Sequence, residues 1–285
     1  MSVLSIHSHV VHGHVGNDAA AFGLRRLGVE TWQLDTMRLS NHPGHGGCTG
    51  RATGADEIAA LTGGLDCLGV LGACDGVLAG YLGAAEQAGP VAAALDRVRT
   101  LRPHSLTVVD PIMGDTEPGR YVPAAVAEVI ARDLVPRADL VTPNAFELGE
   151  LTGRPAGDRG AALAAARALL DAGPRMVVVT SLAADGERVE MLAVTPAAAW
   201  AVTVPRLTFP VAPNGAGDLL AGLVTAALVR GAALADALVA AADAVHEVLL
   251  ATRDADRREL ALVSAQDALA APRRHAACER LDGAG

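Results

Sequence analysis

Lysine is missing from this sequence of 285 residues, so arginine is its only permanently charged basic side chain. Without a side-chain amine, the chain cannot form a Schiff base with an aldehyde or hold a phosphate through lysine. Acidic residues outnumber arginine, because the chain has 32 Asp and Glu but only 23 Arg, which gives a net charge of −9. Nucleic-acid binding needs clustered basic residues against the phosphates, so we expect no nucleic-acid partner.

Cysteines and long apolar stretches are also scarce. The four cysteines, Cys48, Cys67, Cys74 and Cys278, include no pair spaced as in a zinc site or a redox motif. We therefore expect free thiols in a reducing cytoplasm. No run reaches the roughly 18 apolar residues that suggest a membrane span, and the first residues lack the pattern of a secretory signal. These absences predict a cytoplasmic protein that does not engage a membrane.

The chain instead alternates short apolar runs with helical stretches. Because 51% of its residues are hydrophobic, it can bury the core of one domain over residues 1–285, with a loose tail after residue 272. The alternation predicts an α/β fold with a mainly parallel sheet covered on both faces. We expect strands at residues 2–6, 30–34, 76–79, 106–109, 140–142, 176–180, 187–194 and 200–204. We expect helices at residues 17–27, 84–102, 123–135, 161–172, 215–230 and 234–252.

Polar residues stand where several of these strands end. Asp110 ends one expected strand, Thr142 ends another, and Thr180 with Ser181 ends a third. Each position alone is weak evidence, because strand ends often carry polar residues. Ligands of open α/β sheets bind beyond the carboxyl ends of the strands, so the joint placement predicts a ligand crevice there.

The sharpest motif is Gly215-Ala216-Gly217-Asp218, at the start of an apolar helix. Glycines let the backbone approach an anion, and the free amides of a first helical turn attract it. A carboxylate at that place is repelled by phosphates unless it has a task, such as accepting a proton from an attacking hydroxyl. The alternative is that Asp218 only caps the helix.

Two further motifs offer oxygen ligands. Asn144 and Glu147 lie three residues apart, which suits a magnesium site but also a capping box at a helix start. Asp110 and Asp115 flank a turn, where they could hold a hydrated cation near phosphates or bond their own backbone. Spacing alone leaves both alternatives open in each case.

The segment from Ser8 to Asn17 is rich in histidine. A metal cluster is one interpretation, although no cysteine lies nearby in the sequence. A loop that faces a substrate is the interpretation we favour.

Taken together, these motifs resemble those of the pyridoxal kinases, members of the ribokinase-like family. They occur in family order from about residue 2 to about residue 270. The Ser-His-Val-Val and Ser-Asn-His segments are specific to pyridoxal kinases, whereas Gly-Ala-Gly-Asp is shared with other sugar and vitamin kinases. The matching segments lie at residues 5–11, 13–17, 40–42, 80–83, 110–115, 121–123, 142–144 and 215–218.

The resemblance implies a three-layer α/β/α sandwich, a homodimer, and a flap near residues 42–54 that closes over the site. It implies that Asp218 is the general base, and that Gly215, Ala216 and Gly217 form the anion hole. The residues implied to line the pyridine pocket are Ser8, Val15, His42 and Tyr81.

The resemblance also implies where nucleotide and cations bind. Thr180 would lie by the nucleotide phosphates, together with Gly215 and Gly217. Mg2+ would accompany ATP, and a monovalent cation such as K+ could bind as well. The implied ligands of these cations, their waters or the nucleotide are Asp110, Asp115, Thr142, Asn144 and Glu147.

Five positions depart from the family pattern. His7 stands where Gln is usual, His12 where Tyr is frequent, and Asn214 is atypical before the glycine turn. Pro43 replaces a Thr, which removes a possible hydrogen bond to the substrate and stiffens the flap. Arg120 replaces a Cys of some relatives, which excludes a thiol adduct with an aldehyde there. These changes leave phosphate chemistry intact and bear on substrate preference.

The expected reaction is transfer of the γ-phosphoryl group of ATP to the 5′-hydroxymethyl group of pyridoxal. A kinase for another hydroxymethyl heterocycle, such as a hydroxymethylpyrimidine, is the neighbouring alternative. A non-catalytic protein that binds B6 vitamers is the alternative from another class. The joint presence of Asn144, Glu147 and Asp218 argues against it, because a non-enzyme could lose any of them.

Overall fold

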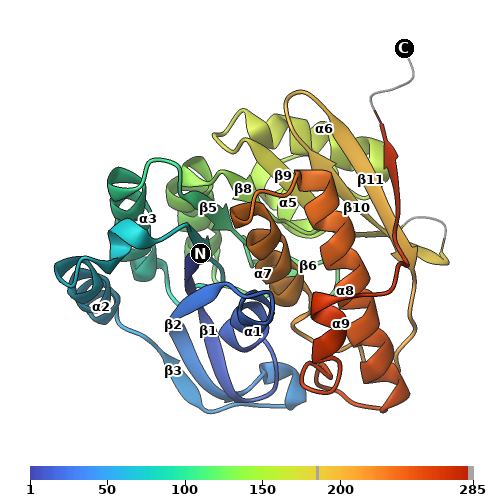
Figure 1. Ribbon diagram of the computed structural model, residues 1–285, viewed down its shortest axis with the longest axis horizontal. Helices are drawn as coiled ribbons and strands as arrows, with labels where there is room; N and C mark the ends of the chain where they lie inside the picture. The colour runs from blue at the N-terminus through green and yellow to red at the C-terminus, as the bar shows by residue number, and fades with distance from the viewer. Residues whose placement is uncertain (184–185, 282–285) are drawn as a thin grey trace.

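A ten-stranded sheet forms the centre of the protein (Figure 1). The structure is a computed structural model that describes residues 1–183 and 186–281. The strands, in chain order, are β1 Ser2–His12, β2 Glu30–Asn41, β3 Gly50–Ala52, β4 Gly76–Ala79, β5 Leu106–Val109, β8 Leu140–Val141, β9 Met176–Ala183, β10 Arg188–Val194, β11 Ala199–Pro205 and β12 Ala277–Arg280. They lie in the order β12-β11-β10-β9-β8-β5-β4-β1-β2-β3. The six central strands from β9 to β2 are parallel, and antiparallel strands extend both edges.

Helices cover both faces of the sheet, so the predicted three-layer α/β/α fold is confirmed (Figure 1). One face carries α1 Asn17–Arg26, α7 Ala216–Val229, α8 Leu234–Asp254 and α9 Gln266–Ala270. The other carries α2 Ala55–Cys67, α3 Ala88–Leu101, α4 Ala124–Val129, α5 Ala145–Thr152 and α6 Arg159–Leu170. Among the helices of the described residues, none is both long and apolar enough to cross a bilayer.

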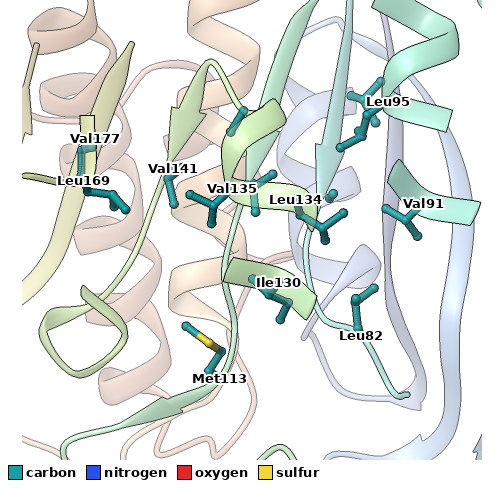
Figure 2. Close-up of a cluster of buried hydrophobic side chains, with 14 of the residues drawn as sticks. Leu82, Val91, Leu95, Met113, Ile130, Leu134, Val135, Val141, Leu169 and Val177 are labelled. Atoms are coloured by element: carbon teal, nitrogen blue, oxygen red, sulfur yellow. The ribbon is translucent and has the colours of Figure 1, made fainter. Parts of the chain in front are cut away.

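Short strands with apolar residues on both faces explain this layering. Successive side chains of a strand point to opposite faces, so a strand between two helical layers must be apolar throughout. In β1, Val3 belongs to the core under α1 and α7, whereas Leu4 belongs to the opposite core. In β8, Leu140 belongs to the core under α1 and α7, and Val141 belongs to the opposite core. Figure 2 shows part of the core on the face opposite α1 and α7, where Leu82, Ile130, Leu134 and Val141 lie among residues of α3 and α6.

The structure differs from the sequence expectations at several elements. β1 and β2 run on to His12 and Asn41, and their paired ends extend beyond the rest of the parallel sheet, with a register shift between His7 and Ser8. The sequence pattern does not predict α2, because Gly63 and Gly64 interrupt a helix with only two buried side chains. The expected helix at 123–135 continues beyond α4 as η4 (Ile130–Leu134), with π-type hydrogen bonding, and the short 3-10 turn η5 (Val135–Arg137).

The tail also differs from expectation within its described part. Instead of a loose segment after residue 272, the chain packs on α8 and then forms β12 against β11. Asp243 of α8 accepts hydrogen bonds from the backbone N–H groups of His275 and Ala276, each at 2.7 Å. The expectation for residues 282–285 lies outside the described residues.

Close packing of α1 on α7 generates a testable prediction. A Cβ atom added at Gly222 would lie 2.6 Å from the carbonyl oxygen of Ala20, so Gly222→Ala must push the two helices apart. We expect a loss of about 1–3 kcal/mol in the free energy of unfolding, the usual range for overpacking. The matched control is Gly63→Ala in α2, where an added Cβ contacts nothing within 4 Å. That control should gain about 0.5–1 kcal/mol from helix propensity. Chemical denaturation of both variants checks the pair, and equal effects would contradict the packing argument.

Candidate active site

The Gly215-Asp218 motif folds as the glycine turn that begins α7. Gly215 has a φ of 91°, and a Cβ atom there would lie 2.0 Å from the carbonyl oxygen of His14. Only glycine fits this turn, which brings the start of α7 against the loop after β1. Gly217 instead faces open space, because an added Cβ there would meet no atom within 4 Å. The turn therefore leaves first-turn backbone amides free to contact an anion.

Asp218 lies in this first turn with its side chain 14% exposed. Its Oδ2 accepts a hydrogen bond from the backbone N–H of Gly16 at 2.7 Å, and its Oδ1 lies 3.3 Å from Nε2 of His7. Burial alone would raise the pKa of Asp218, but His7, the Gly16 N–H and His42 outweigh it and hold the pKa below its ordinary value. Asp218 is thus an ionised carboxylate that can accept a proton.

Asp110 lies beside this carboxylate, directly after β5, and is almost fully buried. One oxygen each of Asp110 and Asp218 and a ring nitrogen of His7 lie within 4.8 Å of one another. The Thr142 hydroxyl, directly after β8, donates to Oδ1 of Asp110 at 2.8 Å. Burial, with the charges of Glu147 and Asp218, raises the pKa of Asp110 to about 8. Asp110 and Thr142, expected to lie close together at the strand ends, are therefore in direct contact.

Asn144 and Glu147 form the capping box at the start of α5. The side chain of Asn144 accepts from the Glu147 N–H at 2.9 Å, and Oε2 of Glu147 accepts from the Asn144 N–H at 2.9 Å. Oε1 of Glu147 also accepts from the N–H of Met113 at 3.0 Å. Burial raises the pKa of Glu147 to about 7. The capping geometry is thus realised, and it holds an oxygen-rich group rigidly beside the β5 turn.

Thr180 and Asp115 lie on either side of this group. Thr180 of β9 pairs with Asn144, and its N–H donates to the carbonyl of Pro143 at 2.9 Å. Asp115 lies in the hairpin of β6 (Gly114–Asp115) and β7 (Gly119–Arg120), where it is exposed and accepts from the Thr116 N–H at 2.6 Å. Its charge reaches Glu147 and contributes to raising the pKa there.

The residues expected to contact an acceptor come from the ends of β1, β2 and β4 and from the loop before α1. Ser8 packs on Gly16, where an added Cβ would lie 2.4 Å from the serine Oγ. Val15 is buried on the same loop. Burial lowers the pKa of His42, and the charge of Asp218 opposes this shift, so His42 lies within electrostatic reach of the base. Tyr81 follows β4 and is partly buried, which raises its pKa.

Glu259 closes the outer side of this region, and sequence reasoning missed it. Its Oε2 accepts from the His14 N–H at 2.9 Å, and its Oε1 pairs with Nε2 of His45 on η1 (Pro43–His45). Arg258 also donates to the carbonyl of Gly44 at 3.0 Å. The segment expected as a flap is therefore held to the loop after α8. Because Glu259 and His45 are 214 residues apart, no local pattern could have revealed the pair.

Known proteins resemble this chain over most of its length. A sequence model of the phosphomethylpyrimidine kinase family matches residues 72–259. The pyridoxal kinase PdxY of Pseudomonas entomophila is 43% identical over 282 residues, which cover 98% of this chain and 97% of the relative. The chain belongs to the pyridoxal kinase family.

Solved structures of this family share the whole fold. Pyridoxal kinase from Leishmania donovani, in complex with ADP and pyridoxamine, has a TM-score of 0.91 at 28% identity, with 98% of this chain and 99% of that chain covered. A putative phosphomethylpyrimidine kinase from Bacteroides thetaiotaomicron, in a crystal form with pyridoxal, has a TM-score of 0.86 at 26% identity, with 98% and 99% covered. The fold and the enzyme class expected from the sequence are thereby confirmed: the chain is an ATP-dependent kinase that acts on an alcohol group.

The raised pKa of Asp110 predicts how stability depends on pH. A carboxyl whose folded pKa lies above its unfolded pKa stabilises the fold less as pH rises, until the folded pKa is passed. Asp110→Asn removes this term, so it should stabilise the ligand-free protein more at about pH 8 than at about pH 5. Thermal unfolding of both proteins at the two pH values, in buffer without divalent or potassium ions, measures the difference. A benefit independent of pH would show that Asp110 is ionised in the folded protein throughout.

Proposed function

We propose that this chain is a pyridoxal kinase, which transfers the γ-phosphoryl group of ATP to the 5′-hydroxymethyl group of pyridoxal. The observation that carries the proposal is the ionised Asp218 in the glycine turn of α7, next to Ser8, Val15 and His42. Relatives whose structures contain ADP with B6 vitamers support the choice of substrates. A kinase specific for a hydroxymethylpyrimidine is the competing assignment, because the matching family model carries that name.

In the proposed reaction, the acceptor hydroxyl hydrogen-bonds to Asp218 and attacks the γ-phosphorus in line with the leaving ADP oxygen. The O–P bond to the acceptor forms as the bond to ADP breaks, and the hydroxyl proton passes to Asp218. The backbone amides of Gly215, Ala216 and Gly217 face the negative charge of the transferred group. Because this transition state needs little covalent help, the chain contributes mainly by positioning and by charge.

The oxygen donors around the capping box suit a hydrated Mg2+ ion. Asp115, Asn144 and Glu147 supply carboxylate and amide oxygens, the ligands that Mg2+ prefers, and few such groups are needed because the ion keeps several waters. When bound with ATP, Mg2+ neutralises phosphate charge. Asp110 and Thr142 form a second oxygen pair, buried, which suits a monovalent cation such as K+. The nucleotide would then lie along Asp110, Asn144, Glu147 and Thr180 towards Gly215 and Gly217.

We further propose that residues 42–54 form the flap of the site and that the enzyme is a homodimer. Support for the flap comes from the His45–Glu259 pair, which holds η1 over the His14 loop and the start of α7. Tyr81 would line the pyridine ring from the opposite side. Support for the dimer is the family resemblance. Each subunit would carry one site.

Competition between acceptors tests the assignment. We expect pyridoxal to be phosphorylated in preference to hydroxymethylpyrimidine when both are present in equal amounts with ATP and Mg2+. The reason is that Ser8, His42 and Tyr81 are the residues that we propose line a pyridine pocket. Chromatographic separation of the phosphorylated products gives the ratio of kcat/KM values directly. Faster phosphorylation of hydroxymethylpyrimidine than of pyridoxal, pyridoxine and pyridoxamine would overturn the proposal.

Replacement of the base tests the mechanism. Asp218→Asn keeps the shape of the side chain but cannot accept the proton, so turnover should fall by roughly 10²–10⁴-fold. The loss corresponds to about 3–5 kcal/mol of transition-state stabilisation. The variant should still fold and bind ATP, and both properties serve as controls. Near-normal turnover would show that Asp218 only caps α7.

A further inference from the structure

His7 occupies a place that the proposed mechanism does not use. It lies at the register shift of β1 and is 1% exposed, with its ring directed at the catalytic carboxylate. Its Nε2 lies 3.3 Å from Oδ1 of Asp218 and has no well-formed hydrogen bond to any group of residues 1–183 or 186–281. A buried ring nitrogen without a partner is unfavourable, and Asp218 is the acceptor within reach.

The backbone fixes which ring nitrogen of His7 carries the hydrogen. The N–H of Ser8 donates to Nδ1 of His7 at 2.8 Å, so Nδ1 must hold its lone pair. In the neutral ring the hydrogen is then on Nε2, the atom that faces Asp218. The neutral ring of His7 can thus donate a hydrogen bond from Nε2 to the carboxylate.

The same assignment excludes a metal as the reason for the cluster. His7, Asp110 and Asp218 lie close enough to surround an ion, but a ligating Nε2 would need its lone pair free. With the hydrogen on Nε2, the ring can donate to a carboxylate but cannot bind a cation there.

Packing prevents the ring from turning away. A Cβ atom at Gly80 would lie 2.1 Å from Cδ2 of His7, so the imidazole lies directly on the Gly80 backbone. Rotation would break the Ser8 N–H bond on one side, while Gly80 closes the other. The donor is therefore held in one orientation relative to Asp218.

We propose that His7 is a positioning residue, whose Nε2–H fixes the rotation of the Asp218 carboxylate so that its free lone pair faces the acceptor hydroxyl. The terminal torsion of an aspartate is broad, and the Gly16 N–H holds only Oδ2. A second donor on Oδ1 defines the plane of the carboxylate. The inference rests on the proposed function in one respect, namely that Asp218 accepts the proton.

Three replacements of His7 separate positioning from packing. His7→Gln retains an N–H of similar reach, His7→Leu retains bulk without a donor, and His7→Asn retains an amide too short to reach Asp218. We expect turnover with pyridoxal to fall roughly 10- to 100-fold in His7→Leu and His7→Asn, the size expected for a misplaced catalytic group. His7→Gln should stay within about 3-fold of the parent, and KM for pyridoxal and ATP should change little in all three.

A double-mutant cycle with Asp218→Asn distinguishes a failure of the positioning role from a failure of the proposed function. If His7 acts through Asp218, adding His7→Leu to Asp218→Asn should cause little further loss of turnover. Full additivity, or equal losses in His7→Gln and His7→Leu, would overturn the positioning role. Undiminished turnover in Asp218→Asn itself would instead overturn the proposed base, whatever the His7 variants do. If His7→Leu does not fold, His7→Gln and His7→Asn are compared instead. Equal losses of turnover in these two variants would also overturn the positioning role.

Discussion

A carboxylate held in place at a site that attracts anions is the constraint on which this structure depends. The N-terminus of α7 offers free amides to phosphate, yet Asp218 places a negative charge in the same turn. The Gly16 N–H and His7 compensate that charge from the β1 side. Because these donors come from the register shift within β1 and from the turn before α1, the carboxylate is held in place only when β1, α1 and α7 pack together.

Several unusual local features result from the packing of β1, α1 and α7 around Asp218. Gly215 adopts a left-handed conformation against the carbonyl of His14, and Gly16 leaves no room for a side chain beside Ser8. Gly222 lets α7 approach α1 to the distance of a backbone contact. Burial, followed by the charges of Glu147 and Asp218, raises the pKa of Asp110, so one of two neighbouring carboxyls is ionised and the other is protonated at neutral pH. Gly16, Gly215 and Gly222 thus all allow the close packing of β1, α1 and α7 that holds Asp218 in place.

The sequence predicted most of the parallel core, because short apolar strands buried on both faces leave a clear pattern, as at residues 76–79 and 106–109. It also predicted the turn before Asp218, and it offered the capping box of Asn144 and Glu147 as one of two interpretations, since both features are local in the chain. It did not predict α2, whose glycines and exposed side chains weaken the helical pattern, or β12, which depends on the partner β11. The contacts of Glu259 and the direction of the His7 ring join distant segments, and no local pattern encodes them.

Whether Asp218 is ionised while Asp110 beside it is protonated can be measured through the pKa values of the two carboxyl groups. Carbon-13 NMR of aspartate-labelled protein without ligands, with Asp218→Asn and Asp110→Asn to assign the signals, gives each titration separately. We predict that the Asp218 signal titrates below the ordinary range of an aspartate, and that the Asp110 signal titrates near about 8. An Asp218 carboxyl that stays protonated at neutral pH would contradict the account, because it could not accept the proton of the acceptor hydroxyl.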